Sequence, residues 1–270
     1  MTRPAFVETR DGHLLAYRDE GSGPPVVFIH GWSLSGAIWQ PQLEYLVANG
    51  HRVITYDRRG HGHSAKPATG YDYDTLSDDL AAVLAHTGVT GATLVGHSMA
   101  SGEIARYFAR HGGKHVARTV FVAPTTPFAL KTPDNPEGTD RAAFDQLVAV
   151  LEADPKQYLT AGAPSLVGPY APPEMLKWAL DMAYQADPVA LVKCVRAFTE
   201  TDFRADLGTI KVPTLVVHGT ADLPMIASNA YRTSAAIAGS RLHAYEGAPH
   251  GLFITDRERF NADLLRFARS

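Results

Sequence analysis

Short apolar runs recur along the chain, and each is too brief to form a helix. They occupy residues 26–29, 53–56, 93–95, 119–122 and 215–217. A run that is apolar throughout is typical of a strand buried on both faces. Between most runs lie segments whose apolar residues recur every three or four positions, as in residues 39–49, 75–86 and 102–111. The alternation predicts an α/β fold with a mostly parallel central sheet and helices on both faces.

The two ends of the chain extend this pattern. Residues 6–9 and 14–17 flank the turn-forming pair Asp11-Gly12, which predicts an N-terminal β-hairpin. Near the other end, strand-like residues 212–219 and 241–245 precede a helical pattern over residues 257–266. We therefore expect the same sheet to include both ends of the sequence.

The alternation is interrupted between two predicted strands. Residues 124–206 are rich in proline, lack a convincing strand run and contain helical patterns over residues 141–152, 174–185 and 188–200. A structureless loop of this length is implausible inside a compact domain. The sequence predicts a core made of residues 1–123 and 207–270, with residues 124–206 inserted as a helical cap that can roof a site.

One serine stands between a predicted strand and a predicted helix. It is Ser98, in the segment Gly96-His97-Ser98-Met99-Ala100. A serine at a sharp strand-to-helix turn is held in a strained conformation that exposes its hydroxyl, and small neighbours make room for that turn. Ser98 is therefore a candidate nucleophile. A plain strand-to-helix turn is the alternative reading of this pentapeptide.

A nucleophilic serine needs a base and a group that orients the base. Of the 12 histidines, His250 lies in a tight loop after the strand-like residues 241–245, where it can reach over the carboxyl edge of the sheet. Asp222 follows the strand over residues 215–217, and its chain position completes the order Ser, Asp, His. Asp202 and Asp206 are rivals, but both precede that strand.

A second site element follows the strand over residues 26–29. Here the chain continues as His30-Gly31-Trp32. Two backbone N–H groups aimed at a developing oxyanion stabilise the tetrahedral intermediate of acyl transfer. We expect Trp32 and Met99 to supply these donors, and His30 to brace the loop by hydrogen bonds.

Other residues exclude several classes of function. The segment from Asp57 to Ser64 contains His61 and His63 but lacks a metal-binding pattern, so we interpret it as a rigid turn after a strand. Cys194 is the only cysteine, which excludes an intramolecular disulfide, and its apolar surroundings predict a buried side chain. We expect no metal and no cofactor.

Charge and hydropathy limit the partners. The net charge of −3 supplies no basic field for nucleic acid or an anionic membrane surface. No stretch approaches the roughly 20 apolar residues of a membrane span, and the first residues lack the apolar core of a secretion signal. We therefore expect a cytoplasmic protein with a small-molecule partner, no nucleic-acid partner and no membrane partner. A homo-oligomer stays open.

Over nearly its whole length the chain resembles a known group of proteins: the cofactor-free (non-heme) bacterial haloperoxidases, perhydrolases and aryl esterases of the α/β-hydrolase superfamily. The resemblance rests on motifs spread over six segments, which are residues 30–36, 56–60, 70–75, 102–107, 201–206 and 247–251. It implies the α/β-hydrolase fold, a triad of Ser98, Asp222 and His250, and oxyanion donors at Trp32 and Met99. It also implies activity on small esters through an acyl-enzyme that hydrogen peroxide can intercept to form a peracid.

Three features depart from this group. His97 and Ala100 stand where its members have Phe and Gly, Ser33 stands where a proline is associated with perhydrolysis, and the loop over residues 220–224 is short. These departures favour hydrolysis of small or aryl carboxylic esters, with perhydrolase or haloperoxidase chemistry as a side activity. Lactone and amide hydrolysis remain open, as does a non-catalytic small-molecule receptor on the same fold.

Overall fold

Eight strands form one sheet in the computed structural model, which describes residues 4–222 and 227–270. Their spatial order is β1-β2-β4-β3-β5-β6-β7-β8, and only the pairs β1–β2 and β2–β4 are antiparallel. The strands are β1 (Ala5–Glu8), β2 (Leu14–Gly21), β3 (Pro25–Ile29), β4 (Arg52–Tyr56), β5 (Ala92–His97), β6 (Val116–Val122), β7 (Thr214–Gly219) and β8 (Arg241–Tyr245). The predicted hairpin and the predicted, mostly parallel sheet are confirmed.

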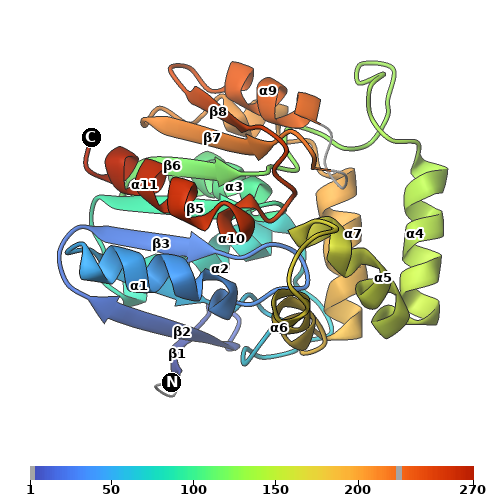
Figure 1. Ribbon diagram of the computed structural model, residues 1–270, viewed down its shortest axis with the longest axis horizontal. Coiled ribbons are helices and arrows are strands. Elements are labelled where there is room, and N and C mark those ends of the chain that lie inside the picture. Colours follow the sequence, from blue (N-terminus) through green and yellow to red (C-terminus); the bar gives the residue numbers. More distant parts are fainter. Residues whose placement is uncertain (1–3, 223–226) are drawn as a thin grey trace.

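Helices cover both faces of this sheet (Figure 1). In the view of Figure 1, α1 (Gln40–Ala48), α10 (Leu252–Thr255) and α11 (Arg257–Ala268) lie in front of the strands, and α2 (Tyr73–His86) and α3 (Ala100–His111) lie behind them. Three further helices are η1 (Gly36–Trp39), α8 (Arg204–Leu207) and α9 (Ala227–Ala236). The α/β-hydrolase fold predicted from the sequence is confirmed.

Alternating side chains of β3 show why the helices cover both faces. Val26 and Phe28 pack in the core that includes the buried side chains of α1 and α11. Val27 and Ile29 pack in the other core, with the buried side chains of α2 and α3. Successive side chains of a strand point to opposite faces, so a strand that is apolar at every position needs cover on both sides.

Five helices lie between β6 and β7 in the sequence, and the first four group at one end of the sheet (Figure 1). These four are α4 (Arg141–Ala153), α5 (Pro155–Val167), α6 (Pro173–Ala183) and α7 (Pro188–Glu200). Buried side chains from α4, α5, α6 and α7 form an apolar cluster of their own. The domain boundaries stay a prediction, and the one placed between residues 206 and 207 falls inside α8.

Among the longer helices, the sequence patterns did not predict α5 and α9. In α5, Pro164 lies inside the helix, where proline removes a backbone donor and normally marks a helix end. In α9, Ser228, Asn229, Thr233 and Ser234 interrupt the apolar periodicity. Both helices are held by packing onto their neighbours, which a local pattern does not record.

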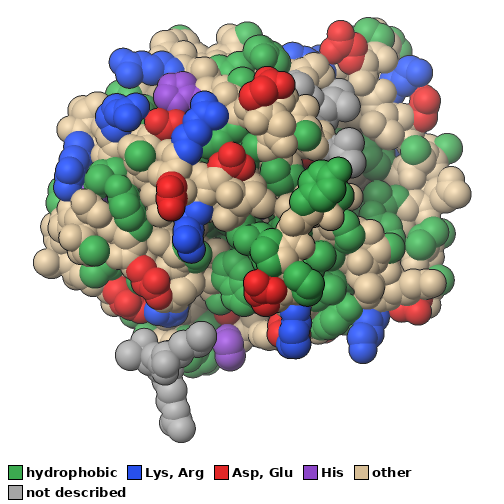
Figure 2. Space-filling model, viewed as in Figure 1, with side chains coloured by type: hydrophobic (Ala, Val, Ile, Leu, Met, Phe, Trp, Pro, Cys, Tyr) green, Lys and Arg blue, Asp and Glu red, His purple; other side chains and the backbone are tan. Residues whose placement is uncertain are grey.

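The surface carries charges of both signs. Figure 2 shows Lys and Arg interspersed with Asp and Glu over the face in view. Within the described ranges, no helix combines the length and the apolar character that crossing a bilayer requires.

Candidate active site

Ser98 lies at the turn between β5 and α3, in a backbone conformation that residues other than glycine rarely adopt. Its φ is 55°, and its N–H donates to the carbonyl of Val122 at 2.8 Å. Left-handed backbone is unfavourable for a residue with a Cβ, so the surrounding hydrogen bonds must hold it in place. Ser98 also lines a cavity beneath the cap helices. This conformation fits the strained strand-to-helix turn that the sequence predicts.

The residues on either side of this turn explain its sequence. A Cβ at Gly96 would lie 2.7 Å from Cδ1 of Ile104 and 3.2 Å from the Cβ of Ala100, so a larger residue at the first small position would displace these side chains. Ala100 begins α3 with ordinary helical geometry and is absent from the described residues with positive φ. A methyl group is therefore tolerated at Ala100, the position at which the family resemblance implies glycine.

Asp222 and His250 meet at the carboxyl ends of two neighbouring strands. Asp222 follows β7 and His250 follows β8, and the His250 Nδ1–H donates to Oδ2 of Asp222 at 2.8 Å. The Asp222 side chain is completely buried, and His250 is 7% exposed. His250 lines the same cavity as Ser98. The fold thus brings together the three residues that the sequence singled out.

The two rival aspartates have other partners. Asp202 forms an ion pair with Arg204 at 2.6 Å, and Asp206 forms one with Arg106 at 2.7 Å. His218 is a further neighbour of the site, because its Nδ1 lies 3.8 Å from the Asp222 oxygen that also accepts from His250. Burial lowers the pKa of His218 below its usual value, with the charge of His250 acting in the same direction.

His97 contacts the site from the position just before Ser98. Its ring centroid lies 4.6 Å from that of His250, and its Nε2–H donates to the backbone carbonyl of His250 at 3.2 Å. Burial lowers the pKa of His97 well below 6.5, so the ring is neutral. The sequence marked His97 only as a departure from related proteins, and its contact with His250 depends on a distance that no motif encodes.

The loop after β3 approaches Ser98 closely. A Cβ at Gly31 would lie 2.5 Å from Nδ1 of His97 and 3.4 Å from the Cβ of Ser98, so this position requires glycine. The next residue, Trp32, donates its indole Nε1–H to the carbonyl of Leu191 in α7 at 2.9 Å. Ser33 follows with a φ of 63°. The cap therefore holds one residue of this loop directly.

The cavity that contains Ser98 and His250 has a volume of about 430 Å³. Apolar side chains from all four cap helices line it, among them Phe144, Leu159, Leu180 and Phe198. No Asp, Glu, Lys or Arg is present among the described residues of its wall. The sequence predicted a roofed site. It did not predict which cap side chains face the site, because the same helical patterns are compatible with several ways of packing the cap helices.

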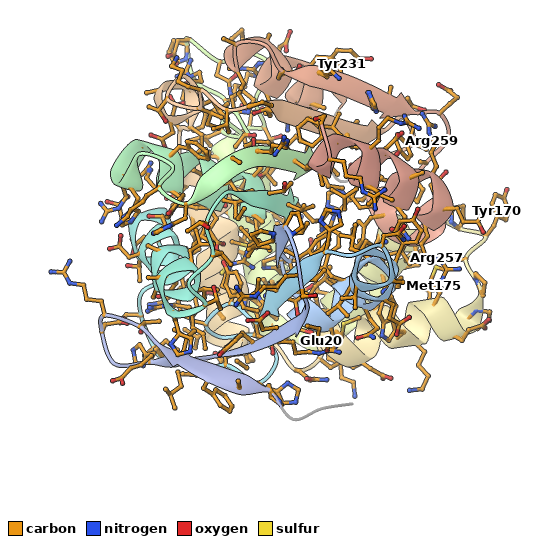
Figure 3. All side chains as sticks on the ribbon, turned by 90° about the vertical axis from the view of Figure 1, so that its left-hand side faces the viewer. Glu20, Tyr170, Met175, Tyr231, Arg257 and Arg259 are labelled. Atoms are coloured by element: carbon orange, nitrogen blue, oxygen red, sulfur yellow. The ribbon has the colours of Figure 1, made fainter. Side chains whose placement is uncertain are left out.

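A second hollow lies outside this cavity. It has a volume of about 360 Å³ and is lined by Tyr170, Met175 and Pro249 among others, and Asp256 is the one charged side chain among its described lining residues. Ser165 in α5 lines both spaces. Tyr170 is 97% exposed and projects outward from the loop before α6 (Figure 3). This hollow contains none of the predicted site residues.

The charged segment after β4 is a braced turn. Asp57 accepts hydrogen bonds from the N–H groups of Gly36 and His63, at 2.7 and 2.8 Å. Arg58 and Arg59 form buried ion pairs with Glu103 and Asp79. In the part of the chain that the structure describes, no group of three His, Cys, Asp or Glu side chains could hold a metal ion.

The predicted burial of Cys194 is confirmed. Its side chain is fully buried, and burial raises the pKa of the thiol to about 12. A thiol in this state is protonated at neutral pH and is a poor nucleophile. Part of the loop over residues 220–224, whose shortness the sequence suggested, lies outside the described residues.

Comparison with known proteins identifies the family. The family model described as alpha/beta hydrolase fold matches residues 24–257. The chain belongs to the α/β-hydrolase family. Within this family, it is 39% identical to a non-heme haloperoxidase from Rhodococcus erythropolis, over 98% of this chain and 99% of that protein.

Two further proteins similar to this α/β-hydrolase are named as esterases. A bifunctional esterase/perhydrolase from Acinetobacter calcoaceticus is 36% identical, over 98% of this chain and 99% of that protein. The solved structure of an esterase from Exiguobacterium antarcticum superposes with a TM-score of 0.96 at 30% identity, covering 99% of this chain and 100% of that one. The resemblance to the non-heme haloperoxidase group that the sequence motifs indicated is confirmed.

Proposed function

We propose that this α/β-hydrolase is a serine hydrolase of carboxylic esters, with Ser98 as nucleophile, His250 as general base and Asp222 as the acid that orients the histidine. One observation carries the proposal. His250 donates its Nδ1–H to Asp222 while its ring lines the same cavity as the strained Ser98. The Asp222 hydrogen bond assigns the Nδ1 proton, which leaves Nε2 to exchange a proton with Ser98.

The reaction proceeds in two halves. Oγ of Ser98 forms a bond to the acyl carbon while its proton moves to Nε2 of His250. The bond between the acyl carbon and the alcohol oxygen then breaks, and the alcohol leaves with that proton. Water repeats the sequence on the acyl-enzyme, so that the acid departs and Ser98 regains its proton. Asp222 stabilises the imidazolium that forms in each half.

The negative oxygen of each tetrahedral intermediate requires fixed donors. The backbone N–H groups of Trp32 and Met99 have this role in the proposal. Support comes from the close approach of the two segments, since a Cβ at Gly31 would nearly touch Ser98. Losing one such donor typically lowers kcat by about 10²- to 10³-fold.

The proposed substrates are small or aryl carboxylic esters. The cavity of about 430 Å³, whose described wall is largely apolar and contains no Asp, Glu, Lys or Arg, supports neutral acyl groups. The names of the related esterase and esterase/perhydrolase support the same reaction class. Lactones and amides would use the same acyl-enzyme, and the acyl-length preference is set by the cap.

A perhydrolase side activity fits the same acyl-enzyme. Hydrogen peroxide in place of water would attack the acyl carbon, release a peracid and return the proton to Ser98, and the peracid would then oxidise a halide in solution. Plain hydrolysis is the proposed main reaction. Ser33 has a φ of 63°, whereas proline is restricted to a φ near −65°, so this loop differs from one with proline at that position.

Turnover of p-nitrophenyl butyrate by the wild type and by Ser98→Ala tests the proposal. Wild-type turnover that is lost in a folded Ser98→Ala protein is the expected result. Equal turnover by both proteins would reject Ser98 as nucleophile, and no turnover by the wild type would favour a non-catalytic receptor.

Further features stay predictions. They are the core and cap boundaries, cytoplasmic residence, the absence of nucleic-acid and membrane partners, and the open question of a homo-oligomer.

A further inference from the structure

The two proposed oxyanion donors belong to peptide groups whose carbonyls are also held. In a trans peptide the C=O and N–H bonds point in opposite directions within one plane. A hydrogen bond to the carbonyl of one residue therefore limits the direction of the N–H of the next. For Trp32 the relevant carbonyl is that of Gly31, and for Met99 it is that of Ser98.

His30 holds the first of these carbonyls. The backbone N–H of Arg58 donates to Nε2 of His30 at 2.9 Å, so the ring proton is on Nδ1. That Nδ1–H donates to the carbonyl oxygen of Gly31 at 2.7 Å. Burial, with the nearby Arg58 charge, lowers the pKa of His30 well below 6.5, which keeps the ring in this neutral form.

Ser101 holds the second carbonyl. Its Oγ–H donates to the carbonyl oxygen of Ser98 at 2.7 Å, and its backbone N–H donates to the same oxygen at 3.0 Å. The side chain is fully buried in the first turn of α3. An oxygen with two donors from one residue has little freedom to turn.

A buried ion pair joins the two arrangements. The Nη2 atom of Arg58 lies 2.8 Å from Oε2 of Glu103, and it also donates to the carbonyl of His30 at 2.8 Å. Glu103 lies in the same first turn of α3 as Ser101 and also accepts a hydrogen bond from Tyr56. Both charged side chains are completely buried, which is costly unless each is well paired.

We propose that His30 and Ser101 are positioning residues for the oxyanion hole, each holding the carbonyl of the peptide whose N–H is a donor, and that the Arg58–Glu103 ion pair joins them. The inference rests on the proposed function. In this inference Arg58 and Glu103 align the loop after β3 with α3, and the side chains of the cavity wall bind the substrate.

Ser101→Ala tests the inference, because the structure offers a matched control. Ser77 is also a fully buried helical serine, in α2, and its Oγ–H donates to the carbonyl three residues earlier, that of Asp74, at 2.8 Å. Ser77→Ala removes the same kind of hydrogen bond, at a residue that is distant in the sequence from the proposed donors Trp32 and Met99.

The expected result separates kcat from KM. Ser101→Ala should lower kcat about tenfold, since a misdirected donor loses part of the effect of a deleted one. KM should change less than about twofold, because the donors act mainly on the transition state. The inhibition constant of phenylboronic acid, whose adduct with an active serine is tetrahedral, should rise about as much as kcat falls. Ser77→Ala should match the wild type in all three quantities.

A second pair of variants tests His30. His51 is buried and contacts the carbonyl of Pro24 at 3.1 Å, near the amino end of β4. His30→Ala should reproduce the loss in kcat, and His51→Ala should not. If His30→Ala fails to fold in a thermal melt, the serine pair still decides the question.

Two outcomes overturn the inference in different ways. An active wild type with equal kcat for Ser101→Ala and Ser77→Ala would reject the positioning role and leave the proposed function intact. A wild-type protein that hydrolyses no ester would reject the proposed function and the inference with it.

Discussion

Asp222 accepts the Nδ1–H of His250 at 2.8 Å. The two residues follow neighbouring strands of the sheet, Asp222 after β7 and His250 after β8. The bond joins residues 28 positions apart and lies in a region where both side chains are buried. A buried carboxylate in this position fixes the tautomer of the imidazole and stabilises its protonated form.

Asp222→Asn should therefore lower kcat by about 10³- to 10⁴-fold, because an amide cannot stabilise the imidazolium and favours the wrong tautomer. Steady-state hydrolysis of p-nitrophenyl butyrate measures the effect. Asp202→Asn is the control, since that carboxylate pairs with Arg204. A loss below about tenfold in Asp222→Asn would show that another acid orients His250.

The buried histidines should make the protein sensitive to acid. Burial lowers the pKa values of His30 and His97 well below 6.5 and that of His61 to about 3. In this range the unfolded chain binds protons that the folded protein does not. Above about pH 6.5 these histidines therefore do not reduce the free energy of unfolding. Below that pH the free energy of unfolding decreases by about 1.4 kcal/mol per pH unit for each such histidine.

His97→Phe tests this dependence. An aromatic ring is kept and one proton-binding group is removed, so the slope of unfolding free energy against pH should decrease by about 1.4 kcal/mol per unit between pH 6 and pH 5. Urea unfolding at several pH values measures it. Asp79, whose pKa burial raises to about 6, titrates in both proteins and cancels in the comparison. Identical slopes would mean that His97 is protonated in the folded state.

Gly31→Ala should damage both stability and activity. The added Cβ would lie 2.5 Å from Nδ1 of His97, which forces the loop and the strand end apart. Overpacking of this kind typically costs about 1–3 kcal/mol. Combining Gly31→Ala with His97→Ala removes the clashing ring and should recover part of the stability, as measured by urea unfolding. Additive effects of the two changes would contradict the contact.

The uncharged cavity wall should discriminate against charged acyl groups. p-Nitrophenyl butyrate and mono-p-nitrophenyl succinate share a leaving group, and the second carries a carboxylate at the end of its chain. Because burying an unpaired charge is costly, kcat/KM should be about tenfold or more lower for the succinate. Equal values would indicate that the acyl chain remains in solvent or meets a cation that the described wall does not contain.

The sequence predicted the order of elements well because buried strands and amphipathic helices are local patterns. The predicted helix over residues 188–200 coincides with α7, and the predicted strand over residues 93–95 lies within β5. It missed α5, since Pro164 is a local breaking signal that tertiary packing overrides.

For the site, the chain order and the strand ends were enough to single out Ser98, Asp222 and His250. Contacts between distant segments were beyond reach. Arg58 and Glu103 are 45 positions apart, and no local pattern indicates that they form an ion pair under the loop. The same holds for His97, whose bond to His250 spans 153 positions.

The central claim is that Ser98 is an activated nucleophile, and covalent labelling tests it most directly. A fluorophosphonate captures a serine that is activated by a neighbouring base: an Oγ–P bond forms as the hydroxyl proton moves to the base and fluoride leaves. Mass spectrometry of the labelled, digested wild type should place one phosphonyl group on Ser98, and Ser98→Ala should take up none. An unlabelled wild type, or a label on another residue that persists in Ser98→Ala, would contradict the account.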